Sequence, residues 1–395
     1  MDRALIYSHD TYGLGHLRRC LRIAEALVRG QGVRHVLIAS GSPRAKSFPL
    51  FPGVDVVSLP AVTKSTNGNY ESRSLGLALA DVARIRGEVV RSLLGSFQPQ
   101  LVLVDHSPIG MNGELLPLLE TIAGLRTPPR LVLGMREIVD DAKKVADHWR
   151  RDGVWEILSK VYDAVLVYGD PVIKTTAREL NLADRLPIPV DHVGYVAPTP
   201  IERRRPGFHR PSVVVTTGGG EDGLPILDAY LNFIETSPVA RRVRSILMTG
   251  PFLPHSRLGG RADMLAERGV ELISFSDQAE HVLSSADLAL TMAGYNTVAE
   301  LLAYDLPAIL VPRVFPRVEQ WLRATRLGAV ANFVPVTADE LDVSTLEGLI
   351  DHFLDQPLHK DHQLDLDGAR SAARALTRVG ALTRIGASLL QGTRR

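Results

Sequence analysis

Short apolar segments of strand length alternate along the first half of the chain with longer segments in which apolar residues recur every three or four positions. The short segments are Ala4–Ser8, Val33–Ala39, Val54–Leu59, Leu101–Asp105, Arg130–Gly134 and Ala164–Tyr168. The helical spacing is clearest at Leu17–Arg29, Leu75–Leu94 and Val154–Val161. Strands that alternate with helices in this way are typical of a parallel sheet covered on both faces. The pattern therefore predicts an α/β, doubly wound fold.

A Pro- and Arg-rich segment from His192 to Pro211 interrupts this pattern, which then starts again. The second half has strand-length apolar segments at Ser212–Thr216, Arg244–Thr249 and Val270–Phe275, with a helical pattern at Gly223–Thr236. We therefore predict two Rossmann-like domains that face a cleft, residues 1–195 and 212–365, joined by a linker at residues 196–211. An amphipathic helical pattern in residues 366–395 can pack back across the domain junction.

The stretch from Leu288 to Arg313 has the pattern of a complete strand–helix–strand unit. An apolar segment ends at Ala293-Gly294, a helical pattern follows from Thr297, and a second apolar segment follows from Leu306. In such a unit, phosphates bind at the helix N-terminus and a carboxylate further along the helix binds ribose hydroxyls. Glu300 is placed for this role, and the alternative is an ordinary solvated helix residue.

Composition is that of a soluble globular enzyme and does not indicate a nucleic-acid partner. The 395 residues are 45% hydrophobic and 23% charged, and 45 basic against 44 acidic residues leave a formal net charge of +1. Bulk electrostatics therefore does not favour DNA or RNA binding. With a single cysteine, Cys20, and no apolar signal segment at the N-terminus, we expect a cytoplasmic protein. No apolar run reaches the roughly 20 residues that span a bilayer, so only peripheral membrane contact stays open.

The segment GLGH, Gly13 to His16, follows the first predicted strand and opens a helix. Gly13 and Gly15 allow the backbone to approach a ligand closely. Histidine, with an ordinary pKa of about 6.5, is the side chain best suited to remove a hydroxyl proton near neutral pH. His16 is therefore a candidate general base, and the alternatives are that it caps the helix or binds phosphate.

The helix that follows is expected to bury one face and to expose a basic one. Arg18, Arg19 and Arg22 lie off its apolar stripe. Arg18 is a candidate for binding the acceptor or a phosphate, together with Gly13, Gly15 and Arg136, which follow or end predicted strands.

Asp105 and His106 end the strand at Leu101–Asp105, so they are expected at the edge of the sheet where open α/β folds bind ligands. Asp105 can orient His16 or contact hydroxyl groups of an acceptor. It can also simply cap the next segment, SPIGMNGE. The sequence leaves these three roles open.

In the second half, TTGGGEDG lies between a predicted strand and a predicted helix. Gly218, Gly219 and Gly220 expose backbone N–H groups of the kind that bind a diphosphate. The neighbouring acidic pair, Glu221 and Asp222, competes with phosphate for the same positive field. Further along, Phe275 ends a predicted strand, and Gln320 follows a Pro-rich loop from which it can bind sugar hydroxyls.

Together these residues resemble the GT-B glycosyltransferases, and within them the group that includes the N-acetylglucosaminyltransferase forming lipid II in peptidoglycan synthesis. GLGH is similar to the group's glycine turn ending in histidine, TTGGG to its glycine-rich loop, and AGYNTVAE to its small-residue turn followed by TVAE. The resemblance implies uridine as the base and donor-binding roles for Glu300 at the ribose, for Gly294, Asn296 and Thr297 at the diphosphate, for Gln320 at the sugar and for Phe275 at the base. Retaining members carry a second glutamate eight positions after the first, where this chain has Ala308, which favours inversion.

The leading hypothesis is therefore an inverting glycosyltransferase that needs neither a metal nor a cofactor. It would transfer a hexose-type sugar from a UDP-sugar to a hydroxyl group of a small molecule, a glycan or a lipid-linked acceptor, with His16 as the base. One alternative is a nucleotide-sugar 2-epimerase or hydrolase on the same fold. The other is a non-catalytic protein that binds nucleotide sugars or acts as a scaffold.

Overall fold

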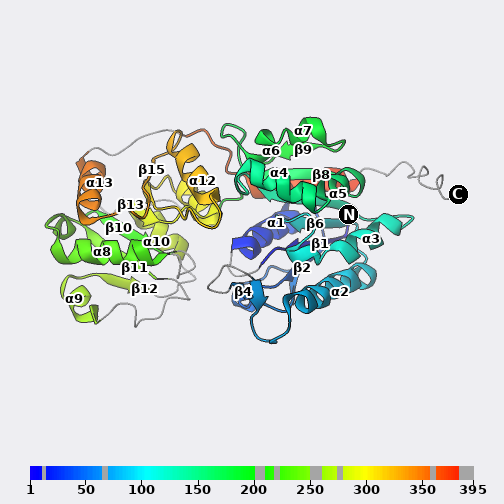
Figure 1. The fold of residues 1–395 in the computed structure, drawn as a ribbon, viewed down its shortest axis with the longest axis horizontal. Coiled ribbons are helices and arrows are strands. Elements are labelled where there is room, and N and C mark those ends of the chain that lie inside the picture. Colours follow the sequence, from blue (N-terminus) through cyan, green and yellow to red (C-terminus); the bar gives the residue numbers. More distant parts are fainter. Residues whose placement is uncertain are drawn as a thin grey trace.

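Two lobes, each built on a parallel sheet, lie side by side in the computed structural model (Figure 1). The structure describes residues 1–10, 15–64, 70–200, 210–217, 223–249, 260–273, 279–355 and 362–381. We call residues 1–200 with 362–381 the first lobe, and residues 210–355 the second lobe.

Within the described ranges, the first lobe has a sheet of seven parallel strands in the order β3-β2-β1-β6-β7-β8-β9. These strands are β1 (Arg3–Ser8), β2 (His35–Ser40), β3 (Val54–Ser58), β6 (Leu101–Asp105), β7 (Arg130–Arg136), β8 (Ala164–Tyr168) and β9 (Val190–His192). The helices are α1 (Gly15–Gln31), α2 (Leu79–Phe97), α3 (Leu116–Gly124), α4 (Ala142–Arg151), α5 (Val154–Lys160), α6 (Thr176–Glu179), α7 (Leu182–Arg185) and α14 (Gly368–Ala381). Strands β6 and β8 are buried along their whole length because helices cover both faces of the sheet.

The described part of the second lobe has a sheet of six parallel strands in the order β12-β11-β10-β13-β14-β15. Its strands are β10 (Ser212–Thr216), β11 (Arg244–Met248), β12 (Glu271–Ile273), β13 (Leu288–Thr291), β14 (Ala308–Leu310) and β15 (Phe333–Pro335). Its helices are α8 (Leu224–Thr236), α9 (Ala262–Glu267), α10 (Ala279–Ser285), α11 (Tyr295–Ala303), α12 (Glu319–Gly328) and α13 (Val343–Asp355). This is the strand order of a Rossmann fold, so the predicted α/β, doubly wound class is confirmed.

Helix α2 and a small hairpin show where the apolar pattern was misleading. The predicted helix began at Leu75, whereas α2 begins at Leu79, because Leu75 and Leu77 are exposed loop residues. Before them lies a short antiparallel pair, β4 (Val62–Lys64) and β5 (Tyr70–Ser72), which the apolar pattern does not predict. Three-residue strands are too short to show a period.

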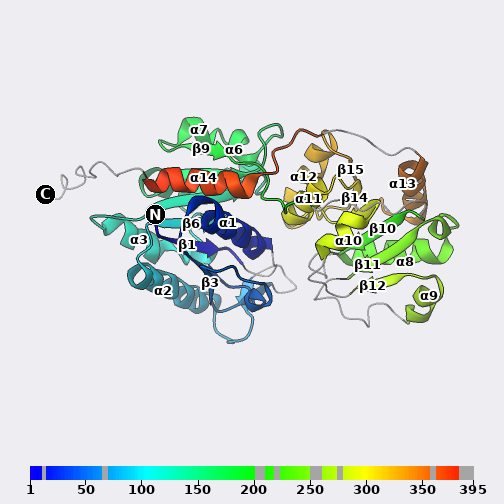
Figure 2. The same ribbon diagram turned by 180° about the vertical axis from the view of Figure 1, so that it is seen from behind.

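The chain crosses from the second lobe back to the first, where α14 packs against α1, β7 and β8 (Figure 2). The crossing is fixed by backbone hydrogen bonds from Tyr195 N to Asp365 O and from Gly368 N to Tyr195 O, at 2.7 and 3.0 Å. A Cβ atom on Gly368 would lie 2.5 Å from the Tyr195 backbone, so this close approach requires glycine. Val196, the first residue of the predicted linker, is buried here and forms a bridge with Asp367.

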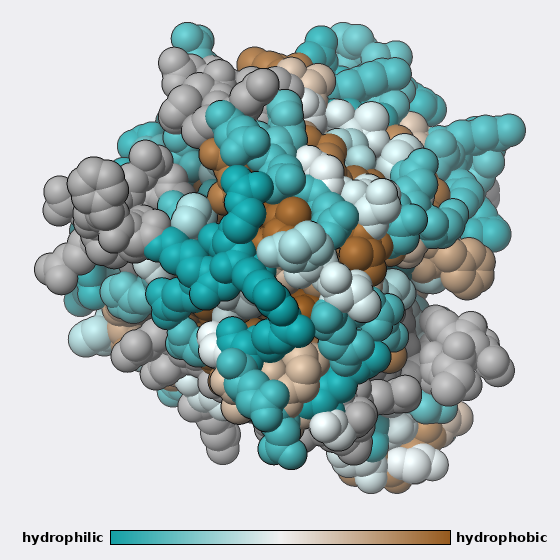
Figure 3. All heavy atoms as spheres, turned by 90° about the vertical axis from the view of Figure 1, so that its left-hand side faces the viewer, coloured by the Kyte–Doolittle hydropathy of each residue, from teal (hydrophilic) through white to brown (hydrophobic). Residues whose placement is uncertain are grey.

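The far end of the second lobe carries a mostly hydrophilic surface, with hydrophobic side chains in small separate patches among the residues coloured in Figure 3. At this end of the lobe, Arg242 forms ion pairs with Asp351 and Asp355 of α13. No helix in the described part of the chain combines the length and the apolar character that crossing a membrane requires.

Candidate active site between the two sheets

His16 and Asp105 meet at the carboxyl edge of the first sheet. His16 lies in the first turn of α1, which follows β1, and Asp105 is the last residue of the adjacent strand β6. The His16 Nδ1 and Asp105 Oδ2 atoms are 2.5 Å apart. Asp105 also binds Arg19 one helical turn further along, with Nε–Oδ1 and Nη2–Oδ2 distances of 3.0 and 2.8 Å. Of the three roles left open for Asp105, the geometry matches the orientation of His16.

The prediction that Arg19 belongs to an exposed basic face of α1 is wrong. Its side chain is 2% exposed and its charge is balanced by Asp105, so it belongs to the buried site. Arg18 and Arg22 are only partly exposed, because both contact the second lobe. Helical spacing shows only that these residues lie off the apolar stripe, and it cannot show that another lobe covers them.

The protonation of this pair follows from its surroundings. Burial lowers the pKa of His16 to about 4, although the Asp105 charge opposes this shift. Burial alone would raise the pKa of Asp105, but the charges of Arg19 and His16 outweigh it and lower the pKa to about 2. Near neutral pH, Asp105 is therefore ionised and His16 is neutral. The Nδ1–H group of His16 donates to Asp105, which leaves a lone pair on Nε2.

Two further histidines surround His16. The ring centroids of His9 and His106 lie 5.6 and 5.2 Å from that of His16. The Arg136 Nη2 atom lies between two of the rings, 3.3 Å from His16 Nε2 and 3.2 Å from His106 Nε2. Burial lowers the pKa of both His9 and His106, so these rings are neutral as well.

His9 was not predicted as a site residue, although it follows β1 just as His106 follows β6. The hydroxyl oxygen of Tyr7 lies 3.3 Å from His9 Nδ1, and the Tyr7 hydroxyl donates to Glu114. Glu114 in turn forms a buried ion pair with Arg86 at 2.5 Å. A polar residue directly after a buried strand was the signal that would have identified His9.

Glu300 faces the first lobe from α11. It is 4% exposed, and its Oε1 atom accepts from Arg18 Nη1 at 3.1 Å and from Arg22 Nη2 at 3.4 Å. The reading of Glu300 as a solvated helix residue is therefore wrong. Arg22 also pairs with Glu280 of α10 at 2.9 Å. These ion pairs join α1 of the first lobe to α10 and α11 of the second lobe.

The turn before α11 also contacts the GLGH segment. Gly294 precedes the helix, and Asn296 Nδ2 donates to the carbonyl of Gly15 at 2.8 Å. A Cβ atom on Gly15 would lie 2.8 Å from this amide nitrogen, so a larger residue at this position would have to move the Asn296 side chain. Thr297 lies in the first turn of α11, where backbone N–H groups lack partners within the helix.

Gln320 lies at the start of α12 and is held by the backbone. Its Oε1 atom accepts from Arg313 N at 3.2 Å. Neighbouring Glu319 pairs with Arg313 Nη2 at 2.8 Å. Five predicted site residues lie outside the described residues, namely Gly13, Gly218, Gly219, Gly220 and Phe275.

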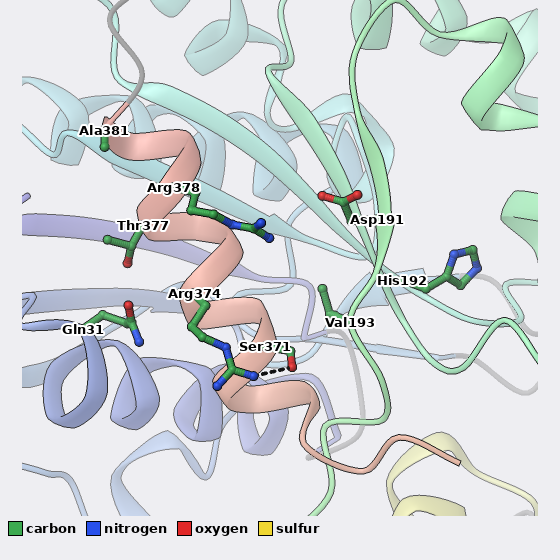
Figure 4. A pocket seen from close by; sticks show the side chains of 9 residues that line it. All are labelled: Gln31, Asp191, His192, Val193, Ser371, Arg374, Thr377, Arg378 and Ala381. Atoms are coloured by element: carbon green, nitrogen blue, oxygen red, sulfur yellow. Dashed lines mark hydrogen bonds between the residues drawn. The ribbon is translucent and has the colours of Figure 1, made fainter. Parts of the chain in front are cut away.

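A pocket in the first lobe lies apart from this cluster. It is found between β9, the end of α1 and α14, and its lining includes Gln31, Asp191 and Arg378 but none of the predicted site residues (Figure 4). Among the residues that the structure describes, no group of three or more His, Cys, Asp or Glu side chains is arranged to hold a metal ion.

Comparison with known proteins bears on the fold and the class of the chain. Residues 256–375 match the family model described as the glycosyltransferase family 28 C-terminal domain. An uncharacterized glycosyltransferase of Methanosarcina acetivorans is 21% identical over 76% of this chain and 77% of its own length. The UDP-N-acetylglucosamine–N-acetylmuramyl-(pentapeptide) pyrophosphoryl-undecaprenol N-acetylglucosamine transferase of Mycobacterium bovis is 25% identical over 78% of this chain and 71% of its own length. With other relatives of that name, the alignment spans less than half of their length.

A solved structure supports the fold over nearly the whole chain. TcCGT1 in complex with UDP superposes with a TM-score of 0.62, at 16% identity, over 95% of this chain and 94% of that one. The chain is therefore a glycosyltransferase with the GT-B fold. Within that class it is similar to the group that includes the lipid II-forming N-acetylglucosaminyltransferases, which confirms the resemblance seen in the sequence.

Proposed function

We propose that the chain is an inverting, metal-independent transferase that moves a hexose-type sugar from a UDP-sugar to a hydroxyl group of an acceptor. The observation that carries this proposal is the 2.5 Å contact between His16 Nδ1 and Asp105 Oδ2. It supplies a neutral and oriented imidazole at the edge of the sheet where α/β folds bind ligands.

The proposed reaction uses the Nε2 side of the His16 ring, opposite Asp105. The acceptor hydroxyl replaces the Arg136 N–H group as the partner of Nε2, and its proton moves to Nε2 while its oxygen attacks the anomeric carbon of the sugar. The bond from that carbon to the diphosphate breaks, and its electron pair leaves with the nucleotide. Attack from the face opposite the leaving group inverts the configuration. The ionised Asp105 stabilises the imidazolium that forms.

On the donor side, we assign the ribose hydroxyl groups to Glu300 and the diphosphate to the first turn of α11, at Gly294, Asn296 and Thr297. The buried carboxylate of Glu300 supports this assignment, because a carboxylate can accept hydrogen bonds from both hydroxyl groups. Ribose would have to replace the 3.1 Å contact of Glu300 with Arg18. Donor binding therefore rearranges the contact between α1 and α11.

The names of similar proteins support the choice of donor. The relative from Mycobacterium bovis is named for UDP-N-acetylglucosamine, and the structure of TcCGT1 contains UDP. That relative's name also contains a pyrophosphoryl-undecaprenol acceptor. For this chain we keep a small molecule, a glycan or a lipid-linked molecule as the acceptor class, with peripheral membrane contact in the lipid-linked case.

Thermal stabilisation by nucleotides tests the donor site without knowledge of the acceptor. Wild type, Glu300→Ala and the exposed control Glu267→Ala would be heated with UDP, GDP, ADP or dTDP. We expect UDP alone to raise the thermal midpoint of wild type and control, and this shift to disappear in Glu300→Ala. If none of the four nucleotides raised the thermal midpoint of the wild type, the proposal would be contradicted.

Product analysis tests the reaction itself. Wild type would be incubated with UDP-hexoses and a panel of hydroxyl acceptors, and products would be identified by mass spectrometry and NMR. We expect a glycoside with the anomeric configuration inverted relative to the donor. A retained configuration would contradict the mechanism, and donor loss that depends on no acceptor would favour the hydrolase or epimerase reading.

A further inference from the structure

The guanidinium groups around the His16–Asp105 pair differ in whether a carboxylate balances them. Three of them are matched at 2.8 Å or less: Arg19 by Asp105, Arg323 by Glu137, and Arg313 by Glu319. Within the described ranges, Arg136 has no carboxylate at ion-pair distance. Each nearby carboxylate already pairs with another arginine. The charges of Glu319 and Asp105 therefore act on Arg136 only through space, without a direct ion pair.

Arg136 is held by two neutral rings instead. Its Nη2 atom contacts the Nε2 atoms of His16 and His106 at 3.3 and 3.2 Å. The Nε–H group of Arg136 and the Nδ1 atom of His106 are buried without a hydrogen-bond partner among the residues described here. Such unpaired donors next to a reacting group are uncommon in folded proteins. They present N–H groups to a ligand that accepts hydrogen bonds.

The backbone conformation of His106 is also unusual, which favours a functional role for its contact with Arg136. His106 has a φ of +71°, a left-handed conformation that costs free energy in a residue with a side chain. This conformation directs the chain out of β6, where His106 meets Arg136. Burial lowers the pKa of Arg136 to about 10, with further lowering from the charges of Arg19 and Arg323, so the side chain stays cationic at neutral pH at a cost in stability.

We propose that Arg136 binds an anionic group, a phosphate or a carboxylate, which the acceptor carries next to the hydroxyl that His16 deprotonates. The planar guanidinium matches both anions in geometry and charge. Because Arg136 contacts the same Nε2 atom that takes the proton, the anion lies beside the attacking oxygen. That the anion belongs to an acceptor rests on the proposed function, whereas the anion site itself does not.

Titration with simple anions tests the site directly. Inorganic phosphate and acetate would be added at constant ionic strength to wild type, Arg136→Gln and Arg317→Gln, while the imidazole NMR signals of His16 and His106 are followed. Arg317 is the matched control, because it is exposed and its charge acts on His9 and His106. We expect one anion to shift both signals in wild type and control, with affinity at least tenfold weaker in Arg136→Gln.

The preferred anion then identifies the chemistry of the acceptor, phosphate-bearing or carboxylate-bearing. The proposal is overturned if neither anion shifts the signals of the wild type, or if Arg136→Gln responds as the wild type does. Arg136→Lys, which keeps the charge but loses the planar fork, should bind with intermediate affinity.

Two further measurements, of the thermal midpoint and of UDP binding, distinguish loss of the anion site from misfolding and from failure of the proposed function. The thermal midpoint of Arg136→Gln should equal or exceed that of the wild type, because an unbalanced buried charge is removed, whereas a purely structural role would lower it. UDP binding should be unchanged in Arg136→Gln. If UDP does not bind even to the wild type, the proposed function is contradicted. The anion titration still tests whether Arg136 binds an anion.

Discussion

At the scale of single residues, Asp105 sets the properties of two neighbours. Its carboxylate balances the buried charge of Arg19 and fixes the ring of His16 with Nε2 toward Arg136. Without it, Arg19 would be a buried cation with no partner, which is costly. One carboxylate therefore serves both the stability of the site and the chemistry proposed for it.

The lowered pKa of His16 makes stability depend on pH in a defined direction. Its folded pKa is about 4, whereas its ordinary value is 6.5. Between these values the unfolded chain binds a proton at His16 that the folded chain does not, so stability falls as the pH decreases through this window. The full effect is about 3 kcal/mol. We expect the free energy of unfolding, measured with urea from pH 7 to pH 4.5, to fall less steeply in His16→Gln than in wild type, and identical slopes would contradict this.

Single-residue roles could be predicted from the sequence only in part. His16 stood out because a glycine turn places it at the start of a helix after a strand. Asp105 could not be assigned one role, because its neighbour depends on β6 lying beside β1, which is a tertiary fact. Arg19 was misplaced for the same reason, since its partner lies 86 positions away.

At the scale of elements, the contact between α1 and α11 joins the two candidate half-sites. Glu300 accepts from Arg18 and Arg22, and Asn296 donates to the backbone of Gly15. The residues on α11 that are proposed to bind the donor are thus held by the helix that carries the proposed base. Ribose binding at Glu300 would release Arg18 and make its guanidinium available to the donor phosphates.

A nucleotide series tests this release of Arg18. Arg18→Gln is expected to weaken binding of UDP by about tenfold, a loss of about 1.4 kcal/mol. It should not weaken binding of uridine, because uridine carries no phosphate and its ribose no longer has to displace Arg18 from Glu300. Isothermal titration with both ligands would measure it. Arg29→Gln, at an exposed position of the same helix, serves as the control. Equal weakening of UDP and uridine would show that Arg18 does not act on the phosphates.

Elements were predictable where burial makes the pattern strong. The strands β1, β6, β8 and β10 were predicted to within one residue, because each is a continuous apolar run. Short or half-exposed elements were not, as the missed hairpin and the predicted start of α2, four residues too early, show. The hydrophobic pattern reports burial, and it loses meaning where apolar side chains such as Leu75 stay exposed.

At the scale of the whole molecule, the two lobes are joined by buried polar and aromatic contacts. Arg323 of α12 reaches Glu137 at the end of β7 at 2.5 Å, and both side chains are fully buried. Tyr195 and Tyr295 stack across the junction with ring centroids 5.8 Å apart. None of these pairs is local in sequence, so the repeating βα pattern predicted two sheets but not how they are joined.

Loss of the Glu137 charge is expected to destabilise this junction. Glu137→Gln leaves the buried guanidinium of Arg323 without its counter-charge, and breaking one partner of a buried pair costs about 3–5 kcal/mol. Urea unfolding should show this loss, whereas Glu120→Gln at an exposed position of α3 should change stability by less than about 0.5 kcal/mol. A Glu137→Gln loss as small as that of the control would mean that the pair does not support the junction.

The measurement that most directly tests the central claim is the rate of sugar transfer by His16→Ala. With the UDP-sugar and acceptor found in the screens, single-turnover rates would be compared for wild type, His16→Ala and the exposed control His148→Ala. We expect a rate 10²- to 10⁴-fold lower in His16→Ala, with UDP affinity unchanged and full activity in the control. Near-normal transfer by His16→Ala at saturating substrates would contradict the role of His16 as the base.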